Sequence, residues 1–189
     1  RIARERGCKI SEYGVYEGDS LQKIEDESAL YRFFGLDPIP PELREGGDEI
    51  DAAREGGLPV LIEASELVGV LHVHSTWSDG RQSIEEMALA ARDRGYRYLG
   101  ISDHSRAAAY AGGLDIDRLR AQREEIEELR ARDLGIEILA GSEVDILPDG
   151  QMDFPDEVLG ELDFVIASIH SSFGQDRETM TGRICGALE

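Results

Sequence analysis

Two histidines stand one residue apart in LHVHSTWSDG, residues 71–80, in a chain that has only four histidines. They follow an apolar run that predicts a β-strand, and side chains two positions apart in a strand project to the same face. His72 and His74 are therefore expected side by side, with Asp79 close behind. Paired imidazoles beside a carboxylate are typical metal ligands. The alternative is a polar strand end that happens to contain histidine.

The remaining histidines and one glutamate occupy similar places. His104 ends a second predicted strand, Glu143 lies near the end of a third, and His170 ends a fourth. In a barrel-like parallel sheet, the loops at the C-terminal edges of the strands converge on one rim. A set of imidazoles and carboxylates without thiolate suits zinc, manganese or iron. We therefore predict a site for several metal ions, with the ligands His72, His74, Asp79, His104, Glu143 and His170.

Three further polar residues near these positions each allow two interpretations. Asp103 either orients the adjacent His104 or caps the following loop. Asp145 shares a strand face with Glu143 by the period of two, or it faces solvent. Arg106 either contacts a phosphate or is an exposed loop residue.

The elements that would position these residues alternate regularly from Val68 onward. Strands are predicted at 68–74, 96–104, 136–146 and 163–170, and helices at 83–95, 115–135, 155–162 and from 176. Repeating units of this kind predict an α/β domain with a parallel sheet. The strands are almost continuously apolar, which predicts that both faces of the sheet are covered. Ser83 and Glu86 form a capping box at the start of the first of these helices.

The chain upstream of this alternation reads differently. Residues 1–48 predict a short helix, one strand through KISEYGVYEG with a turn at Gly18, and a helix in DESALYRFFGL. DPIPPELREGGDE then interrupts regular structure with three prolines and a glycine pair. We predict a small module at 1–48, a partly helical linker at 49–67 and the α/β domain at 68–189.

Composition limits the classes of function. The 189 residues are 41% hydrophobic, which is enough for a buried core, and they carry a formal net charge of −20. Such a charge repels the phosphates of nucleic acid over most of the surface, although bound divalent cations reverse it locally. Cys8 and Cys185 form no paired motif, which favours a reducing compartment, the cytoplasm. No run of residues reaches membrane-spanning length, so we expect no membrane partner.

Four spaced motifs carry a family resemblance. HVHSTWSDG, ISDHS, GSEVDI and ASIHSS resemble, in order, the motifs of the PHP (polymerase and histidinol phosphatase) phosphoesterase domain. SRAAAYAGGLDIDRL and GLDPIPPELREG resemble more closely the C-terminal PHP domain of bacterial family-X DNA polymerases. The segment 1–48, with ARERGCKISEYGVY, resembles the palm-to-thumb end of the polymerase region. The absence of an initiator Met and an end within a predicted helix lead us to expect a fragment of a longer protein.

The resemblance implies a distorted (β/α)7 PHP barrel, incomplete at the C-terminus and preceded by a small α+β remnant of a polymerase palm and thumb. It implies up to three divalent metal ions, Mn, Zn or Fe, with Mg for the polymerase part. By motif matching, the six residues above are the ligands and Glu143 bridges two ions. The family's later ligands, a further His or Cys and an Asp-x-His, lie beyond this sequence. DNA is the implied partner, through the complete polymerase, and the oligomeric state stays open.

The implied activity is metal-dependent phosphoester hydrolysis, specifically 3′–5′ exonuclease action during repair synthesis by a polymerase. Removal of a 3′-phosphate or cleavage at an abasic site follows from the same resemblance. A small-molecule phosphatase of the histidinol-phosphate kind is one alternative, although the polymerase-like segment disfavours it. A non-catalytic PHP module that stabilises its polymerase is the other, and the presence of all six expected ligands disfavours that one.

Overall fold

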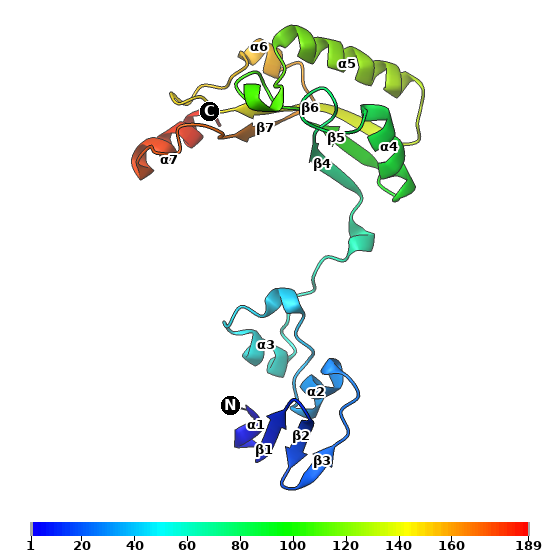
Figure 1. Ribbon diagram of the computed structural model, residues 1–189, viewed down its shortest axis with the longest axis vertical. Coiled ribbons are helices and arrows are strands. Elements are labelled where there is room, and N and C mark those ends of the chain that lie inside the picture. The colour runs from blue at the N-terminus through cyan, green and yellow to red at the C-terminus, as the bar shows by residue number, and fades with distance from the viewer. Residues whose placement is uncertain (1, 189) are drawn as a thin grey trace. The chain divides into compact units, whose positions relative to one another are not determined.

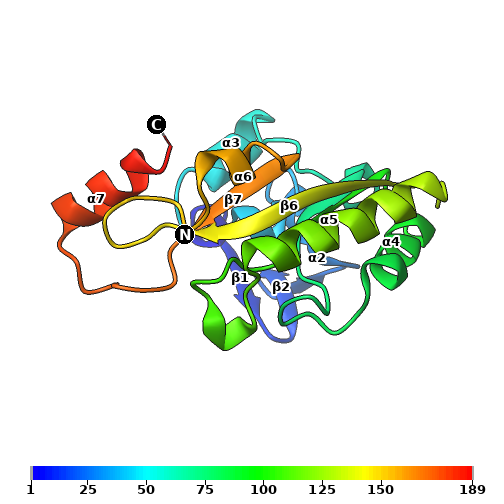
Figure 2. The same cartoon turned by 90° about the horizontal axis from the view of Figure 1, so that it is seen from above.

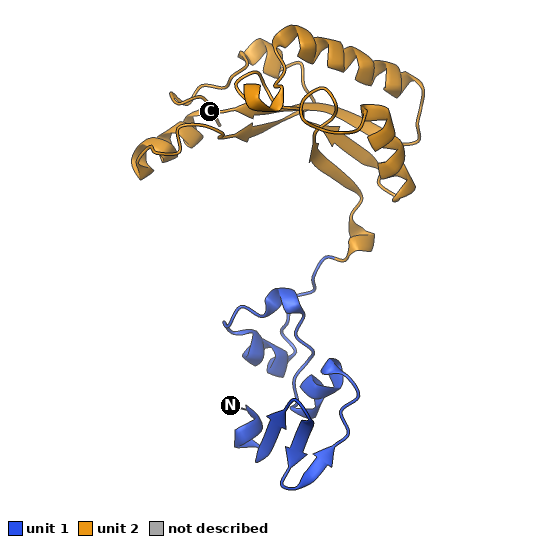
Figure 3. Ribbon diagram, viewed as in Figure 1, with its two compact units in different colours: residues 1–62 blue, residues 63–189 orange. Residues whose placement is uncertain are grey.

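The computed structural model describes residues 2–188. The chain forms two compact units, residues 1–62 and residues 63–189 (Figure 3). Each unit has its own buried apolar residues. Within residues 2–188, no helix is both long and apolar enough to cross a membrane.

The first unit contains a small antiparallel sheet of order β1-β2-β3, with short helices (Figure 1). The predicted single strand through residues 9–18 is wrong, because the chain reverses between Ser11 and Gly14 as well as at Gly18. Gly14 has a φ of +133°, which strains any residue with a side chain. The elements of this unit are α1 (Ile2–Glu5), β1 (Cys8–Ser11), β2 (Gly14–Glu17), β3 (Ser20–Gln22), α2 (Glu27–Phe33), η1 (Pro41–Leu43) and α3 (Glu49–Glu55).

Apolar side chains from α3 and from the loop after α2 form the core of the first unit. Leu36, Ile39 and Ala53 are buried together, with Tyr31 and Phe34 packed against them. Ala53 belongs to α3, so this helix packs with the module at the start of the chain. The N-terminus of α2 is capped by Asp26, whose carboxylate accepts a hydrogen bond from the Ala29 amide at 2.6 Å.

The second unit is an α/β domain with a four-stranded parallel sheet of order β4-β5-β6-β7, which curls (Figure 1). The predicted alternation of strands and helices is confirmed. All neighbouring strands are parallel, so every strand's C-terminus lies at the same edge of the sheet. The elements are η2 (Ala64–Glu66), β4 (Gly69–Val73), α4 (Ile84–Asp93), β5 (Tyr98–Ile101), η3 (Ala109–Ala111), α5 (Ile116–Ala131), β6 (Glu137–Asp145), α6 (Asp156–Leu159), β7 (Phe164–Ser168) and α7 (Arg177–Gly186).

One face of this sheet carries the main core. Ile84 and Ala88 of α4 and Ile126 of α5 pack on Leu99 and Ile138 of the two central strands. Figures 1 and 2 show α5 lying along β6 on this face. The predicted capping box is present at the start of α4. These contacts fix the central strands and therefore the residues that follow them.

The opposite face of the sheet is built differently. A Cβ on Gly141 would lie 2.5 Å from the Phe164 ring, and one on Gly100 would lie 2.8 Å from it. The ring of Phe164 therefore lies directly on the glycine backbone, in place of a helix layer. Leu71, beside Gly100, is 45% exposed. In the described part of the chain the prediction that both faces are covered is thus wrong, because apolar strands of this curled sheet leave one face half open.

Candidate metal centre

The pairing of β5 and β6 continues past the end of β5 and brings His104 to Glu143. These two residues form a parallel bridge, and the Ser105 amide donates to the Glu143 carbonyl at 2.9 Å. Both residues are buried, with 6% and 4% of their surfaces exposed. The sheet backbone therefore places an imidazole and a carboxylate together at its C-terminal edge.

All four histidines of the chain surround the Glu143 carboxylate. Its Oε2 lies 3.3 Å from His72 Nε2, 3.2 Å from His74 Nε2 and 3.0 Å from His104 Nδ1. Its Oε1 lies 3.3 Å from His170 Nε2. One carboxylate oxygen has two lone pairs and cannot accept three good hydrogen bonds. Nδ1 of His104 is in fact buried without a hydrogen-bond partner. Such convergence of donor atoms is better suited to binding cations than to a hydrogen-bond network.

Asp79 reaches the same cluster from the loop after β4. Its Oδ1 lies 2.9 Å from His74 Nδ1, and its Oδ2 lies 3.9 Å from His104 Nε2. The loop is tight, because the Gly80 amide donates to the Ser75 carbonyl at 2.9 Å. A Cβ on Gly80 would lie 2.1 Å from the His74 carbonyl oxygen, so only glycine fits there.

His72 is held in an uncommon backbone conformation. Its φ is +67°, and the pairing of β4 with β5 shifts register between Val70 and Val73. The regular alternation used to predict that His72 and His74 share a face is therefore interrupted, yet both imidazoles reach Glu143. A positive φ at a residue with a side chain costs about 1–3 kcal/mol, and such residues cluster at functional sites.

Asp103 neither orients His104 nor caps the loop that follows it. Its carboxylate is fully buried and accepts from the Ser75 amide at 2.8 Å, the Ser75 hydroxyl at 2.6 Å and the Ser78 amide at 3.1 Å. It also accepts from Gln122 of α5 at 2.6 Å. Asp103 therefore fixes the loop between His74 and Asp79, a role that required long-range contacts and that sequence reasoning missed.

Asp145 and Ser168 support the cluster from the far side. Asp145 is buried, with Oδ2 3.2 Å from His170 Nδ1, so it does not face solvent. The Ser168 hydroxyl donates to Glu143 Oε1 at 2.7 Å. The period of two in β6 indicated Asp145 correctly, but nothing in the sequence pointed to Ser168, which becomes a partner only through the β6–β7 register.

The pKa values of the acidic residues follow from these contacts. Burial raises the pKa of Glu143, but hydrogen bonds from Ser168 and His72 and the charge of His104 outweigh it, so the net pKa is lowered. The hydrogen bond from His74 lowers the pKa of Asp79. Burial lowers the pKa of His104. At neutral pH the carboxylates are thus ionised and His104 is neutral, which are the forms that bind metal.

The six sequence-predicted ligands meet in one place and form three overlapping groups. In each group, one ligand atom per residue lies within 4.8 Å of the others. His74, His104 and Glu143 each belong to two groups, so the arrangement fits neighbouring ions with shared ligands. The donor types and the unpaired His104 Nδ1 fit divalent metals. The groups are His72–His74–Glu143, His74–Asp79–His104 and His104–Glu143–His170.

Arg106 is an exposed loop residue, as one of its two interpretations predicted, but it is also paired with an acidic residue. Its Nε donates to Oδ1 of the buried Asp153 at 3.0 Å, and the Ala107 amide donates to Oδ2 at 2.7 Å. The Arg106 side chain is 59% exposed. It is therefore an ion-paired residue that ties the loop after β5 to the segment before α6.

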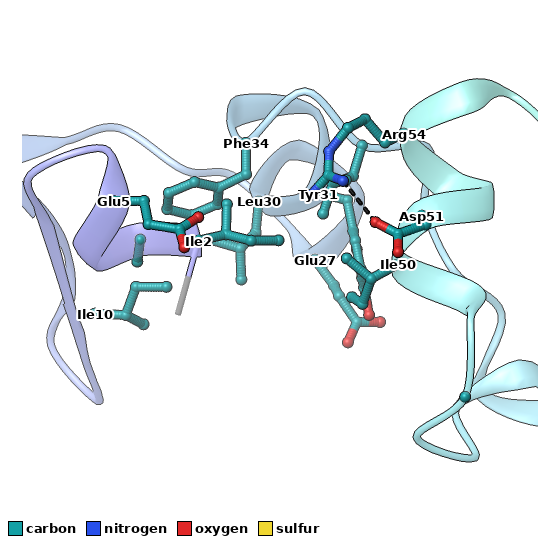
Figure 4. A pocket seen from close by; sticks show the side chains of 13 residues that line it. Ile2, Glu5, Ile10, Glu27, Leu30, Tyr31, Phe34, Ile50, Asp51 and Arg54 are labelled. Carbon is teal, nitrogen blue, oxygen red and sulfur yellow. Dashed lines mark hydrogen bonds and ion pairs between the residues drawn. The ribbon is translucent and has the colours of Figure 1, made fainter.

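A separate pocket of about 660 Å³ lies in the first unit (Figure 4). Its walls are mainly apolar and include Leu30, Tyr31, Phe34 and Ile50, with Arg54 paired to Asp51 at 2.6 Å. It contains no histidine and none of the predicted ligands. The candidate metal ligands therefore lie outside this pocket.

Comparison with known proteins places this geometry in a family. Residues 71–185 match the PHP domain, and residues 1–45 match the DNA polymerase beta thumb. The whole chain is 47% identical to the "DNA polymerase/3′-5′ exonuclease PolX" of Bacillus subtilis, and it spans 33% of that protein. Two Thermoanaerobacter proteins named "probable phosphatase" are 35% identical over 108 residues, which is 56% of this chain and 41% of theirs.

The PHP match includes all six residues of the cluster and more than half of the chain. The motifs that suggested this family from the sequence are thus the same segments that the fold brings to one edge of the sheet. The chain belongs to the PHP domain family.

Proposed function

We propose that this chain is part of a bacterial family-X DNA polymerase and that its PHP domain is a metal-dependent 3′–5′ exonuclease acting in DNA repair synthesis. The observation that carries the proposal is the meeting of four imidazoles and two carboxylates in three overlapping groups. The full-length similarity to a protein named both polymerase and exonuclease supports it, as does the thumb match at residues 1–45. DNA would then bind through the complete polymerase.

The six side chains are proposed to hold up to three divalent ions, manganese or zinc being favoured by the donor set. When bound, such ions supply hydroxide from water near neutral pH and neutralise phosphate charge. Glu143 would contribute both of its oxygens, because each faces a different imidazole group. Asp145 would hold the His170 ring by its Nδ1, leaving Nε2 toward the cluster.

We further propose the arrangement of domains around this site. Residues 1–48 would end a palm and thumb region, and the PHP domain would begin at residue 68. Residues 49–67 would link the two, with α3 of this linker packed on the first unit. The curled four-stranded sheet would be the first part of a (β/α)7 barrel. The half-open face of the sheet supports this, because barrel closure by further strands would cover Leu71.

A small-molecule phosphatase is the second candidate. The similarity of part of the chain to the two proteins named phosphatase favours it. The metal cluster alone does not separate the two, because divalent ions neutralise charge on a terminal phosphate and on an internal phosphodiester alike.

The test compares the intact polymerase with His72→Ala and Glu143→Ala variants. A 5′-labelled oligonucleotide is incubated with Mn²⁺, and shortening from the 3′ end is followed on a gel. Glu128→Ala, which changes an exposed carboxylate of α5, serves as the matched control. A parallel assay measures nucleotide incorporation.

We expect both site variants to lose degradation and keep incorporation, while Glu128→Ala behaves like the parent. Equal degradation by all forms would place the activity elsewhere. Release of phosphate from small monoesters without oligonucleotide shortening would favour the phosphatase, and inactivity toward both substrates would favour a module that only stabilises the polymerase.

A further inference from the structure

An exposed tyrosine stands next to the metal cluster and is not explained by metal binding. The ring of Tyr110 in η3 lies 6.2 Å from the His104 ring and 6.3 Å from the His170 ring, between centroids. Tyr110 is nevertheless 73% exposed. Among residues 2–188, its hydroxyl has no hydrogen-bond partner. The ring therefore borders the cluster and offers both its face and its hydroxyl to a ligand.

The loop that carries Tyr110 is fixed rather than free. Ala108 and Ala111 on either side are buried, and the Leu114 amide donates to the His104 carbonyl at 2.7 Å. A Cβ on Gly113 would lie 1.9 Å from the Ser105 carbonyl oxygen, so the backbone packs closely there. The chain thus anchors both sides of Tyr110 and leaves its ring at the rim.

The charge of the surroundings suggests what such a ring would do. The chain carries a net charge of −20, and Arg106 on the same loop is engaged with Asp153. A polyanionic strand would gain little general attraction from this surface. Stacking of bases on aromatic rings supplies affinity that does not depend on positive charge and tolerates any base.

We propose that the Tyr110 ring stacks on the terminal nucleobase of a single-stranded substrate whose phosphodiester lies at the metal cluster. Only a sugar separates a base from its phosphate. A ring whose centroid lies 6.2 Å from that of His104 and 6.3 Å from that of His170 is therefore near enough to contact the base while the phosphate lies at the cluster. This inference rests on the proposed function and names the feature of the substrate that the site would read. Tyr110 would set the preference for a nucleoside over a bare phosphate ester.

The test uses two 5′-labelled oligonucleotides that differ only at the 3′ end, which carries either thymidine or an abasic tetrahydrofuran. The intact polymerase with Mn²⁺ is compared with Tyr110→Ala, Tyr110→Phe and the control Tyr13→Ala, a 77% exposed tyrosine of the first unit. We expect Tyr110→Ala to lower kcat/KM about tenfold on the thymidine end, the size of a lost stacking contact, and to leave the abasic end unchanged. Tyr110→Phe and Tyr13→Ala should match the parent on both.

Equal losses on both ends, or no loss on either, would overturn the proposal. A loss in Tyr110→Phe equal to that in Tyr110→Ala would assign the hydroxyl instead of the ring.

A binding measurement separates this inference from the proposed function. Thymidine 5′-monophosphate and deoxyribose 5-phosphate are titrated into the Mn²⁺-loaded protein by calorimetry. If the parent degrades neither oligonucleotide, the exonuclease proposal fails. Stacking is still supported in that case if Tyr110→Ala lowers the affinity for thymidine 5′-monophosphate and leaves that for deoxyribose 5-phosphate unchanged. Stacking is refuted if Tyr110→Ala causes no such selective loss of affinity.

Discussion

Replacement of Asp103 by alanine removes the acceptor that fixes the loop between two candidate ligands. The carboxylate is fully buried, and its partners in the described chain are neutral donors: the amides and hydroxyls of Ser75 and Ser78, and the amide of Gln122. The stability of this loop therefore depends on a charged acceptor that is compensated by hydrogen bonds.

The magnitude follows from the groups that Asp103→Ala leaves unpaired. The Ser75 amide and the Gln122 side-chain amide are buried, and each unsatisfied donor costs about 1–3 kcal/mol. The serine hydroxyls can rotate to other acceptors and lose less. Because the contacts form one network, we expect a total of about 3–5 kcal/mol rather than the full sum. That is a large part of the ~5–15 kcal/mol by which domains are stable.

Asp103→Asn should cost less, about 1–2 kcal/mol. An asparagine oxygen can keep both backbone amides, which meet the same carboxylate oxygen, Oδ1. The asparagine NH₂ would then face Gln122, whose Oε1 is buried without a partner. Rotation of the Gln122 amide by half a turn would pair these two groups. The difference between the alanine and asparagine variants thus measures the two backbone amides together with the Gln122 contact.

Unfolding in urea, followed by tryptophan fluorescence, measures these differences. Trp77 is the only tryptophan of the chain and lies within the loop, with its backbone amide 3.1 Å from the Ser75 hydroxyl. Its signal therefore reports on the second unit alone. Asp93→Ala, which removes an exposed ion pair with Arg92, is the control and should stay within about 0.5 kcal/mol. A cost below about 1 kcal/mol for Asp103→Ala would refute the reasoning.

Three further outcomes are expected. Gly80→Ala should weaken Mn²⁺ binding in calorimetry, because its Cβ would lie 2.1 Å from the His74 carbonyl oxygen. The control Gly182→Ala has open space around it in α7 and should raise the free energy of unfolding by about 0.4–1 kcal/mol. Equal Mn²⁺ affinity of the two glycine variants would show that the close approach at Gly80 does not shape the metal site. Asp145→Asn should lower metal affinity about 10–100-fold, because it removes the charged partner of one candidate ligand, and unchanged affinity would contradict that role. Burial lowers the pKa of His104 below its ordinary 6.5, so below that pH the unfolded chain binds a proton that the folded chain does not. The metal-free protein should therefore lose stability in urea as the pH falls from about 7 to about 5.5, and a gain over that range would refute the assignment.

Local patterns in the sequence were enough to predict the main features of the second unit. Apolar runs alternating with amphipathic segments identified its strands and helices, and Ser83 with Glu86 identified a helix start. The placement of His104, Glu143 and His170 at strand ends was visible without coordinates, because strand ends are local features and parallel strands share an edge. The hairpin between Ser11 and Gly14 was missed, since a two-residue reversal leaves little trace in hydrophobicity.

Long-range packing, in contrast, determines which polar neighbours serve the cluster. Asp103 stands beside His104 in the sequence but holds Ser75 and Ser78, and Ser168 meets Glu143 through the register of two strands. The exposure of Tyr110 beside two imidazoles likewise depends on how the chain after η3 returns to pair with the segment after β5. Residue type and spacing determine which side chains reach an edge, because they act within one segment. Which of them touch is decided by strand register and loop closure, which join segments that lie 25 to 40 residues apart.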